Sequence, residues 1–411
     1  MWFVLTVEWG FSPLDEELGL LAGNLTPSLQ RHTTQLGSWI PFAKVGPVLQ
    51  DLLGVTVSEP TVRRCTEGHG AAYEVVQTAA VTQIEQELPA PPQGPPKQLL
   101  SVDGAMIPLV GGTWAEVKTL VVGEIAEPVY EKGELVVHST QLSYFSRLTD
   151  SDTFQRLALV ETQRRGVETA QQVVAVTDGA VWIQGFVDYH RVDAARVLDF
   201  GHAAEYVAVI GGGGEGAGSD PFKAWFKASL HTLKHEGFAA LQPELQALVS
   251  AHPAQPERAE ALAYLEKRAA LLCYPQFQAQ GWPIGSGSVE SGNKLVVEAR
   301  LKGAGMHWAR PHVNPMLSLR NAVCSDRWAE AWQEITTQQH DQRQQRYRER
   351  ARQRTLVPPP PPLCPVPTPA ELPAKTEPLS AAPKERWRPA PDHPWRRSLD
   401  PPSRHSRSAK K

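Results

Sequence analysis

The chain has 411 residues, of which 41% are hydrophobic and 21% charged, so it is long enough to bury one large core or two moderate ones. Its longest apolar runs fall far short of the ~20 residues needed to cross a bilayer, and its hydrophobic start lacks the basic residues and cleavage site of a signal peptide. Four scattered cysteines form no CxxC pair, which argues against a disulfide framework and against a zinc ribbon. We therefore expect a cytoplasmic protein with reduced thiols and no membrane partner.

The net charge of −3 is an average over two regions of opposite sign. Residues 341–411 carry 16 Lys and Arg against 7 Asp and Glu, which leaves 25 against 37 for residues 1–340. A basic end suits the phosphate backbone of DNA, although a solvated helix end has the same composition. From residue 356 onward the chain is rich in proline and poor in apolar residues. The composition predicts a basic, Pro-rich disordered tail over 341–411.

Residues 1–90 are predicted to form a helical domain. Apolar residues recur there at three-to-four spacing, and Ser58 is a plausible N-cap before Pro60. Short helices joined by tight turns fit a helix-turn-helix DNA-binding unit, although such pairs are also plain packing modules. The Pro-rich stretch 91–98 then predicts a linker and a domain boundary.

After the linker the hydrophobic period changes from that of helices to that of strands. Three runs read as an antiparallel meander, and an amphipathic helix and a nearly all-apolar strand follow. A short linking segment over 185–196, another strand and a helix complete the region 99–210. The predicted strands cover 98–110, 114–125, 136–148 and 171–183. The order βββαβαβα predicts an α/β fold with an RNase H-like mixed sheet.

Two aspartates occupy costly places on these strands. Asp103 lies within the first strand among apolar neighbours, and Asp178 lies at the end of the fourth strand. A turn or helix-capping role is the alternative for Asp178, which precedes a glycine. Two such carboxylates on neighbouring strands repel each other unless a cation lies between them. Oxygen-only ligands indicate Mg²⁺ or Mn²⁺.

A third carboxylate lies in the stretch "GWPIGSGSVESGNK". Small residues before Glu290 would let the backbone approach a site and start a helix near Ser288, with Glu290 in its first turn. A two-metal site needs a further carboxylate of this kind. A flexible linker or a phosphate loop are the alternatives, but the run lacks the GK[ST] of a P-loop and the GxSxG of a nucleophile elbow.

Three stretches carry a resemblance to a known family: "VDGA", "VTDGAVWIQGFVDYHRVDAARVLDFGHAAEY" and "YPQFQAQGWPIGSGSVESGNKLVVEARLKGAGMHWARPHVNPMLSLRNAV". Together they resemble bacterial insertion-sequence DDE transposases of the ISKra type, which are related to Mutator-like transposases. The resemblance covers most of residues 11–335. It implies that Asp103, Asp178 and Glu290 are the catalytic, metal-binding triad. It also matches Asp199 and His202 in "DFGH" to the C/D-x-x-H signature of these relatives, whereas spacing alone makes His202 an ordinary helix residue.

The resemblance also accounts for the segment between the two halves of the predicted core. Residues 211–283 open with a Gly-rich run and then read as helices. An all-helical insertion at this place, before the last part of the core at 284–340, is similar to that of the same transposases.

Positive and aromatic residues follow Glu290 along one segment. They combine charge for phosphates with a flat surface that could stack on a frayed base, and ordinary helix-surface charge is the alternative. The predicted DNA-binding residues are Lys294, Arg300, Lys302, Trp308 and Arg310.

These observations predict a Mg²⁺-dependent DDE transposase that cuts DNA at the ends of its element and joins the strand to target DNA. Element ends and target DNA are the expected partners, with the protein acting as a homo-oligomer on DNA. An RNase H-like nuclease without strand transfer and an inactive or truncated DNA-binding remnant are the alternatives. The sequence also leaves open a missing N-terminal portion.

Overall fold

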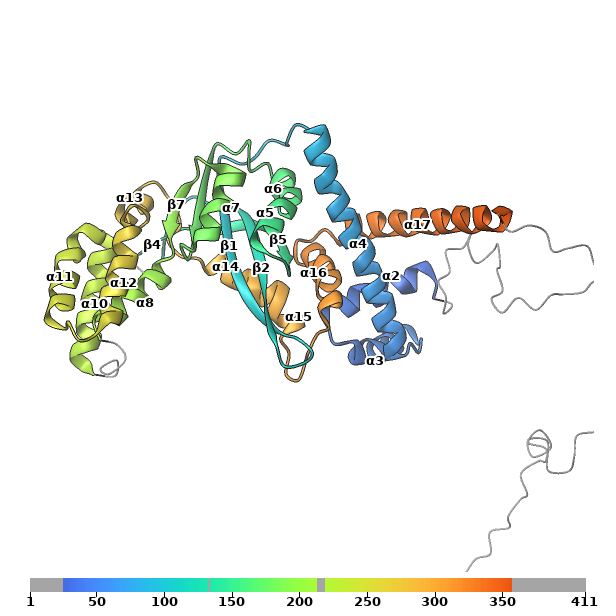
Figure 1. Cartoon of the computed structure of the whole chain (residues 1–411), viewed down its shortest axis with the longest axis horizontal. Helices are drawn as coiled ribbons and strands as arrows, with labels where there is room; N and C mark the ends of the chain where they lie inside the picture. Colours follow the sequence, from blue (N-terminus) through green and yellow to red (C-terminus); the bar gives the residue numbers. More distant parts are fainter. Residues whose placement is uncertain (1–24, 132–133, 213–218, 357–411) are drawn as a thin grey trace, which may run out of the picture. The chain divides into compact units, whose positions relative to one another are not determined.

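The computed structural model describes residues 25–131, 134–212 and 219–356 (Figure 1). The predictions for the first 24 residues and for the tail beyond residue 356 lie outside this part. Three helices open the described chain: α2 (Pro27–Trp39), α3 (Phe42–Leu53) and α4 (Glu59–Glu87). As predicted, α4 follows Ser58 at the N-cap and has Pro60 in its first turn, where a missing amide proton costs no helical hydrogen bond.

A five-stranded mixed sheet forms the centre of the α/β part. Its strand order is β5-β2-β1-β6-β7, with β2 antiparallel to both of its neighbours and with β1, β6 and β7 parallel. The strands are β1 (Lys97–Pro108), β2 (Trp114–Ile125), β5 (Ser139–Arg147), β6 (Gln172–Thr177) and β7 (Ala195–Leu198). A separate hairpin, β3 (Val129–Glu131) with β4 (Glu134–Val136), interrupts the predicted meander.

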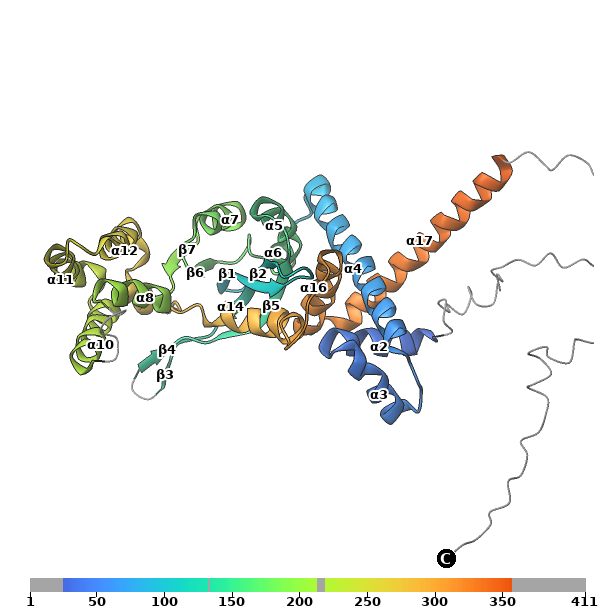
Figure 2. The ribbon, with the colours of Figure 1, turned by 60° about the horizontal axis from the view of Figure 1, so that its bottom comes forward.

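Both faces of the sheet are covered, which explains the apolar character of its strands. Leu100 and Val102 pack under α5 (Ser151–Leu157), α6 (Leu159–Arg164) and α7 (Val181–Arg191), which lie together on one face (Figure 2). Since side chains alternate along a strand, Leu99, Asp103 and Ile107 belong to the other face. The elements on that face are α8 (Phe200–Ile210), α14 (Gly287–Gly292), the π-helical turn η2 (Asn293–Glu298) and α15 (Ala299–Leu301).

Two predicted boundaries in this region are wrong. The strand expected over 171–183 ends at Thr177, because Gly179 takes a positive φ of 78° and turns the chain. The segment expected to be a short link is largely the helix α7, whose buried Ile183, Phe186 and Val187 pack on the sheet. Burial of this helical face outweighs the penalty of Gly185 in the helix.

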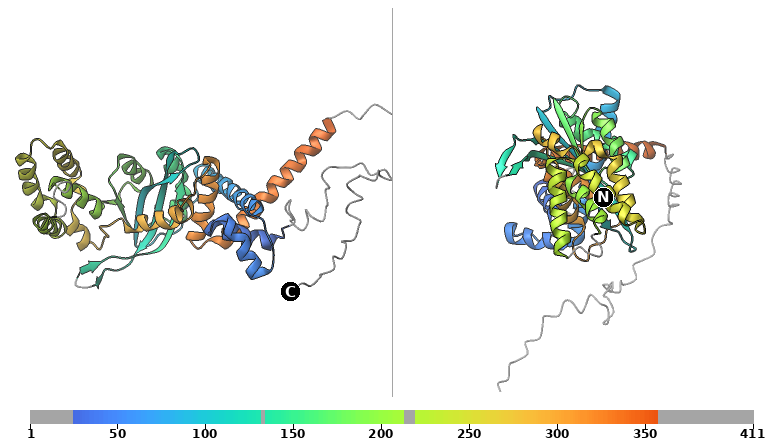
Figure 3. Two further views of the ribbon diagram at one scale, coloured as in Figure 1. Left: turned by 90° about the horizontal axis from the view of Figure 1, so that it is seen from below. Right: turned by 90° about the vertical axis from the view of Figure 1, so that its left-hand side faces the viewer.

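From residue 219 onward, the predicted insertion consists of helices joined by short turns. Its helices gather at one end of the α/β part and share a hydrophobic core with α8 and β7 (Figure 3). They are α10 (Asp220–His235), α11 (Phe238–Ala251), α12 (Pro256–Lys267), η1 (Ala269–Leu271) and α13 (Tyr274–Ala279).

Two helices close the described chain, α16 (Arg310–Cys324) and α17 (Trp328–Leu356). Tyr73 of α4, Leu319 of α16 and Ile335 of α17 share one hydrophobic cluster. Because α17 continues to Leu356, the disordered tail predicted from residue 341 is wrong for residues 341–356. Within the described ranges, none of the helices is both long enough and apolar enough to span a membrane.

Candidate active site

The three parallel strands bring three aspartates to one level of the sheet. Leu100 of β1 pairs with Ala175 of β6, so the register carried three residues further places Asp103 level with Asp178. Thr177 of β6 pairs with Leu198 of β7, which places Asp199 beside Asp178. Side chains at one level of parallel strands point to the same face.

Glu290 reaches the same place from a distant part of the chain. It lies in the first turn of α14, the position predicted from the sequence, and α14 packs on β1 and β2. The side chains surround a pocket of about 370 Å³, which we call the acidic pocket. Its titratable lining residues are Asp103, Asp178, Asp199, His202, Glu205 and Glu290. The acidic residues and the histidine singled out in the sequence therefore converge on one cavity.

Asp103 is the carboxylate most perturbed by this convergence. Burial raises its pKa, and the negative charges of Asp178 and Glu290 raise it further. Two hydrogen bonds oppose the rise: Oδ1 accepts from the backbone of Gly104 at 2.7 Å, and Oδ2 accepts from Nδ2 of Asn293 at 2.9 Å. The buried Oδ1 of Asn293 has no hydrogen-bond partner in the described part of the chain. A charged Asp103 is thus costly in the protein as it stands.

Asp199 links two of the elements that form the acidic pocket. Its Oδ2 accepts the backbone N–H of His202 at 2.7 Å and so caps α8. Its Oδ1 accepts the backbone N–H of Ser286 at 2.6 Å, and the hydroxyl of Ser286 donates to Oε1 of Glu290 at 3.0 Å. Both oxygens of Asp199 are therefore engaged in holding the backbone. This arrangement suits the positioning of Glu290 better than metal ligation.

His202 lies at the wall of the acidic pocket beside aromatic rings. Its ring packs edge-on against Tyr206 and Tyr264, at centroid distances of 5.2 and 6.0 Å. Its Nδ1 lies 3.5 Å from a carboxylate oxygen of Glu205, which the sequence analysis did not single out. An imidazole held in this way can offer an N–H to a ligand in the pocket.

The acidic pocket fits a divalent cation in its donor chemistry, because Asp103, Asp178 and Glu290 offer oxygens alone. Their side chains do not converge closely enough to ligate one as they stand: across the described ranges, no group of three or more His, Cys, Asp or Glu side chains is arranged to hold a metal ion. Each carboxylate instead accepts a hydrogen bond from a nearby group, as Asp178 does from the backbone of Ala180 at 2.9 Å. Cation binding therefore requires these side chains to turn toward one another.

Sequence reasoning missed several residues of the site. Asn293 follows Glu290 by three residues on one helical run, so the two share a helix face, and that spacing was available as a signal. Nothing in the sequence distinguished Ser286 from the other residues of the Gly-Ser run. Glu205 resembles any exposed helix residue, and only the fold brings it to the acidic pocket.

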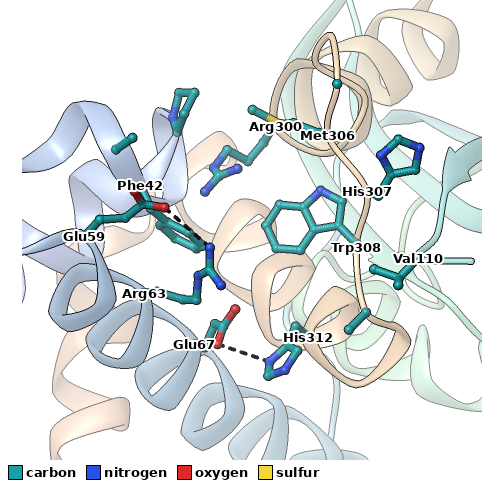
Figure 4. A pocket seen from close by; sticks show the side chains of 14 residues that line it. Phe42, Glu59, Arg63, Glu67, Val110, Arg300, Met306, His307, Trp308 and His312 are labelled. Carbon is teal, nitrogen blue, oxygen red and sulfur yellow. Dashed lines mark hydrogen bonds and ion pairs between the residues drawn. The ribbon is translucent and has the colours of Figure 1, made fainter.

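Two of the predicted DNA-binding residues are buried instead. Arg300 and Trp308 are 2% and 7% exposed. The guanidinium carbon of Arg300 lies 4.6 Å from the ring centre of Phe42 and 5.1 Å from that of Trp308 (Figure 4). We call these three residues the arginine–aromatic cluster. Because both residues are buried apart from the atoms that line a neighbouring pocket, they lack the open surface expected of DNA-binding residues, and their contact with DNA stays a prediction.

The burial of Arg300 has a structural cause. Its Nε donates to the carbonyl of Gly37 at 3.0 Å, and Nη1 of Arg320 donates to the carbonyl of Ser38 at 3.2 Å. These carbonyls belong to the last turn of α2. Carbonyl groups there have no hydrogen-bond partner within the helix and carry partial negative charge. Burial and the nearby Arg320 lower the pKa of Arg300 to about 10, so it stays charged at neutral pH. The two arginines fasten α2 to the segment that follows Glu290.

The arginine–aromatic cluster borders a second pocket, of about 430 Å³ (Figure 4). Other charges on its wall pair with each other: Nη2 of Arg63 lies 3.4 Å from Glu59, and Nδ1 of His312 lies 3.2 Å from Glu67. The lining thus has no surplus of positive charge to attract a DNA backbone.

The other three predicted DNA-binding residues remain accessible. Lys294, Lys302 and Arg310 are exposed, although Lys302 forms an ion pair with Glu298 at 2.8 Å. An exposed i,i+4 pair of this kind is weak and does not prevent a contact with phosphate.

Comparison with known proteins does not assign the chain to a family. A scan of the chain against protein-family models finds no match, and a search of the curated proteins finds none either.

Proposed function

We propose that this protein is a DDE transposase that cuts DNA at the ends of its element and transfers the freed strand to target DNA in a divalent-metal-dependent reaction. One observation carries the proposal: Asp103, Asp178 and Glu290, which are far apart in the sequence, line a single pocket. The order of the mixed sheet, with three parallel strands beside two antiparallel ones, supports the RNase H-like core expected for such an enzyme.

The residues of the acidic pocket divide into two roles in this proposal. Asp103, Asp178 and Glu290 would hold Mg²⁺ or Mn²⁺, which when bound activates the attacking oxygen and stabilises charge on the leaving oxygen. Asp199 and His202 act beside them. Asp199 holds the start of α14 through Ser286, and His202 donates a hydrogen bond to a carboxylate or to the scissile phosphate.

DNA contacts outside the pocket fall to exposed cations. Lys294 follows Glu290 on the same helical run, and Arg310 opens α16. The basic segment 341–411, helical as far as Leu356, attracts phosphates without reading bases. Because the enzyme would act at two element ends, the proposal includes a homo-oligomer on DNA.

A plasmid assay tests the proposal. The substrate carries the DNA that flanks the coding region on both sides, and the products of cleavage and of strand transfer are measured with Mg²⁺ or Mn²⁺. We expect both products from the wild type and neither from Asp178→Ala. The matched control is Asp188→Ala, which removes an exposed aspartate that pairs with Arg196 and should leave both products unchanged.

Other outcomes would replace the proposal. Cleavage without strand transfer would indicate an RNase H-like nuclease. DNA binding without either product would indicate an inactive DNA-binding remnant. Full activity of Asp178→Ala would remove the acidic pocket from the chemistry altogether.

A further inference from the structure

The turn that carries Asp178 is held by the helical insertion. The hydroxyl of Tyr264, on α12, donates to the backbone carbonyl of Asp178 at 2.6 Å. Arg268, which caps the end of α12, donates to the carbonyl of Gly179 from Nε at 3.1 Å and from Nη2 at 2.9 Å. Two adjacent carbonyls of the turn are thus bound by one helix, more than 80 residues further along the chain.

The two donors are themselves held in place. The guanidinium carbon of Arg268 lies 3.6 Å from the ring centre of Tyr264. The other face of the stack is Tyr206 of α8, whose ring is parallel to that of Tyr264 within 5° at a centroid distance of 3.9 Å. Burial raises the pKa of Tyr264 to about 12, so its hydroxyl keeps the donated proton at any working pH. A stack fixed on both sides sets the direction of the hydrogen bonds.

The turn lies so close to Arg268 that only glycine fits at position 179. Gly179 has a φ of 78°, and a Cβ at this position would lie 2.8 Å from Nε of Arg268. Asp178 also folds back locally, with its Oδ1 accepting the N–H of Ala180. A shift of α12 would therefore move the backbone from which the Asp178 carboxylate projects.

We propose that α12 clamps the Asp178–Gly179 turn, and that Tyr264 and Arg268 are positioning residues that set where the Asp178 carboxylate lies in the acidic pocket. The inference rests on the proposed function of that pocket and assigns the helical insertion a part in it. Neither residue lines the acidic pocket. Each acts through a backbone carbonyl.

The test uses the full chain with Tyr264→Phe, which removes one hydroxyl and keeps the stack, and Arg268→Gln. The matched control is Lys267→Gln, which changes an exposed cation of the same helix. Calorimetric titration with Mn²⁺ in the absence of DNA gives the metal affinity, and amide hydrogen exchange reports on the turn. We expect both variants to lose about 10-fold in Mn²⁺ affinity, as outer-shell partners commonly do, with faster exchange at Ala180 and an unchanged melting temperature. Arg268→Lys should recover part of the loss.

The outcomes separate the clamp from a purely structural contact. Faster exchange with unchanged Mn²⁺ affinity would overturn the inference, as would a loss of affinity that only follows a loss of thermal stability. If Asp178→Ala binds Mn²⁺ and cleaves DNA as well as the wild type, the proposed function fails instead. If Asp178→Ala is inactive while Tyr264→Phe and Arg268→Gln match Lys267→Gln in every measurement, only the clamp is wrong.

Discussion

The acidic pocket and the arginine–aromatic cluster both contain residues that the sequence marked as functional, yet these residues have different surroundings in the fold. In the acidic pocket, Asp103, Asp178 and Glu290 line one cavity, and burial, together with the neighbouring negative charges, raises the pKa of Asp103. In the cluster, Arg300 and Trp308 are buried, and Arg300 fastens α2 to the segment that follows Glu290. The carboxylates of the acidic pocket lie close together at a cavity wall, whereas the charge of Arg300 is matched to a helix carbonyl. Substitutions in the two regions should separate activity from stability.

The largest effect is expected at Glu290. Glu290→Gln should reduce cleavage by about 10³-fold or more, a loss in the range seen for essential catalytic groups, because the lost charge no longer helps to hold a cation. The melting temperature should stay within experimental error, since Gln keeps the acceptor for the hydroxyl of Ser286. Glu298→Gln, on the same helical run, is the control. Normal cleavage by Glu290→Gln would remove this residue from the triad.

The opposite result is expected from the arginine–aromatic cluster. Trp308→Ala should lower the free energy of unfolding by about 3–5 kcal/mol, the usual cost of truncating a buried aromatic. Activity per folded molecule should be retained. Trp114→Ala is the matched control because Trp114 is 56% exposed, and its cost should stay below about 0.5 kcal/mol. A stable Trp308→Ala that binds DNA more weakly would support the DNA-binding prediction.

His202 lines the acidic pocket and also packs against aromatic rings, so its substitution tests whether it supports activity or only stability. His202→Ala should slow cleavage by about 10- to 100-fold, as expected for a group that supports metal ligands, with nearly unchanged thermal stability. His231→Ala, an exposed histidine of α10, serves as the control. If activity falls only as far as stability does, His202 is a packed helix residue and nothing more.

A smaller effect on stability is expected at Asp103. Its pKa is raised by burial and by its acidic neighbours, so the native state binds a proton at Asp103 more tightly than the unfolded chain does. Asp103→Asn should therefore stabilise the metal-free protein at neutral pH. The gain should shrink as the pH falls through the raised pKa, because wild-type Asp103 then becomes neutral too. Thermal unfolding in EDTA at several pH values measures this, with Asp188→Asn as the control.

The smallest effect is expected at the exposed cation Lys294. Lys294→Ala should weaken DNA binding only a few-fold and reduce the salt dependence of the affinity by about one phosphate contact. The loss should be the same for different DNA sequences. A loss confined to one sequence would mean that Lys294 reads bases.

Part of the fold could be predicted because strands and helices follow from the short-range periodicity of apolar residues in the sequence. The sequence placed Asp103 within a strand and Asp178 at a strand end, whereas the parallel pairing of β1, β6 and β7 in the structure puts both level with Asp199. The start of α14 near Glu290 follows from local signals in the same way. The helices of the insertion, over its described part, agree with the sequence in the same way.

The rest depended on contacts between segments far apart in the chain. Helix α7 was missed because Gly185 interrupts its helical pattern. Its apolar face is buried only because it packs on the sheet. From the sequence, Arg300 and Trp308 resemble surface residues. In the folded protein, α2 and α3 cover them. By itself the sequence predicted most of the strands and the helical character of the insertion, because these follow from local periodicity. Only the tertiary structure decided which charges meet solvent, because exposure depends on what packs against a residue and not on its neighbours in sequence.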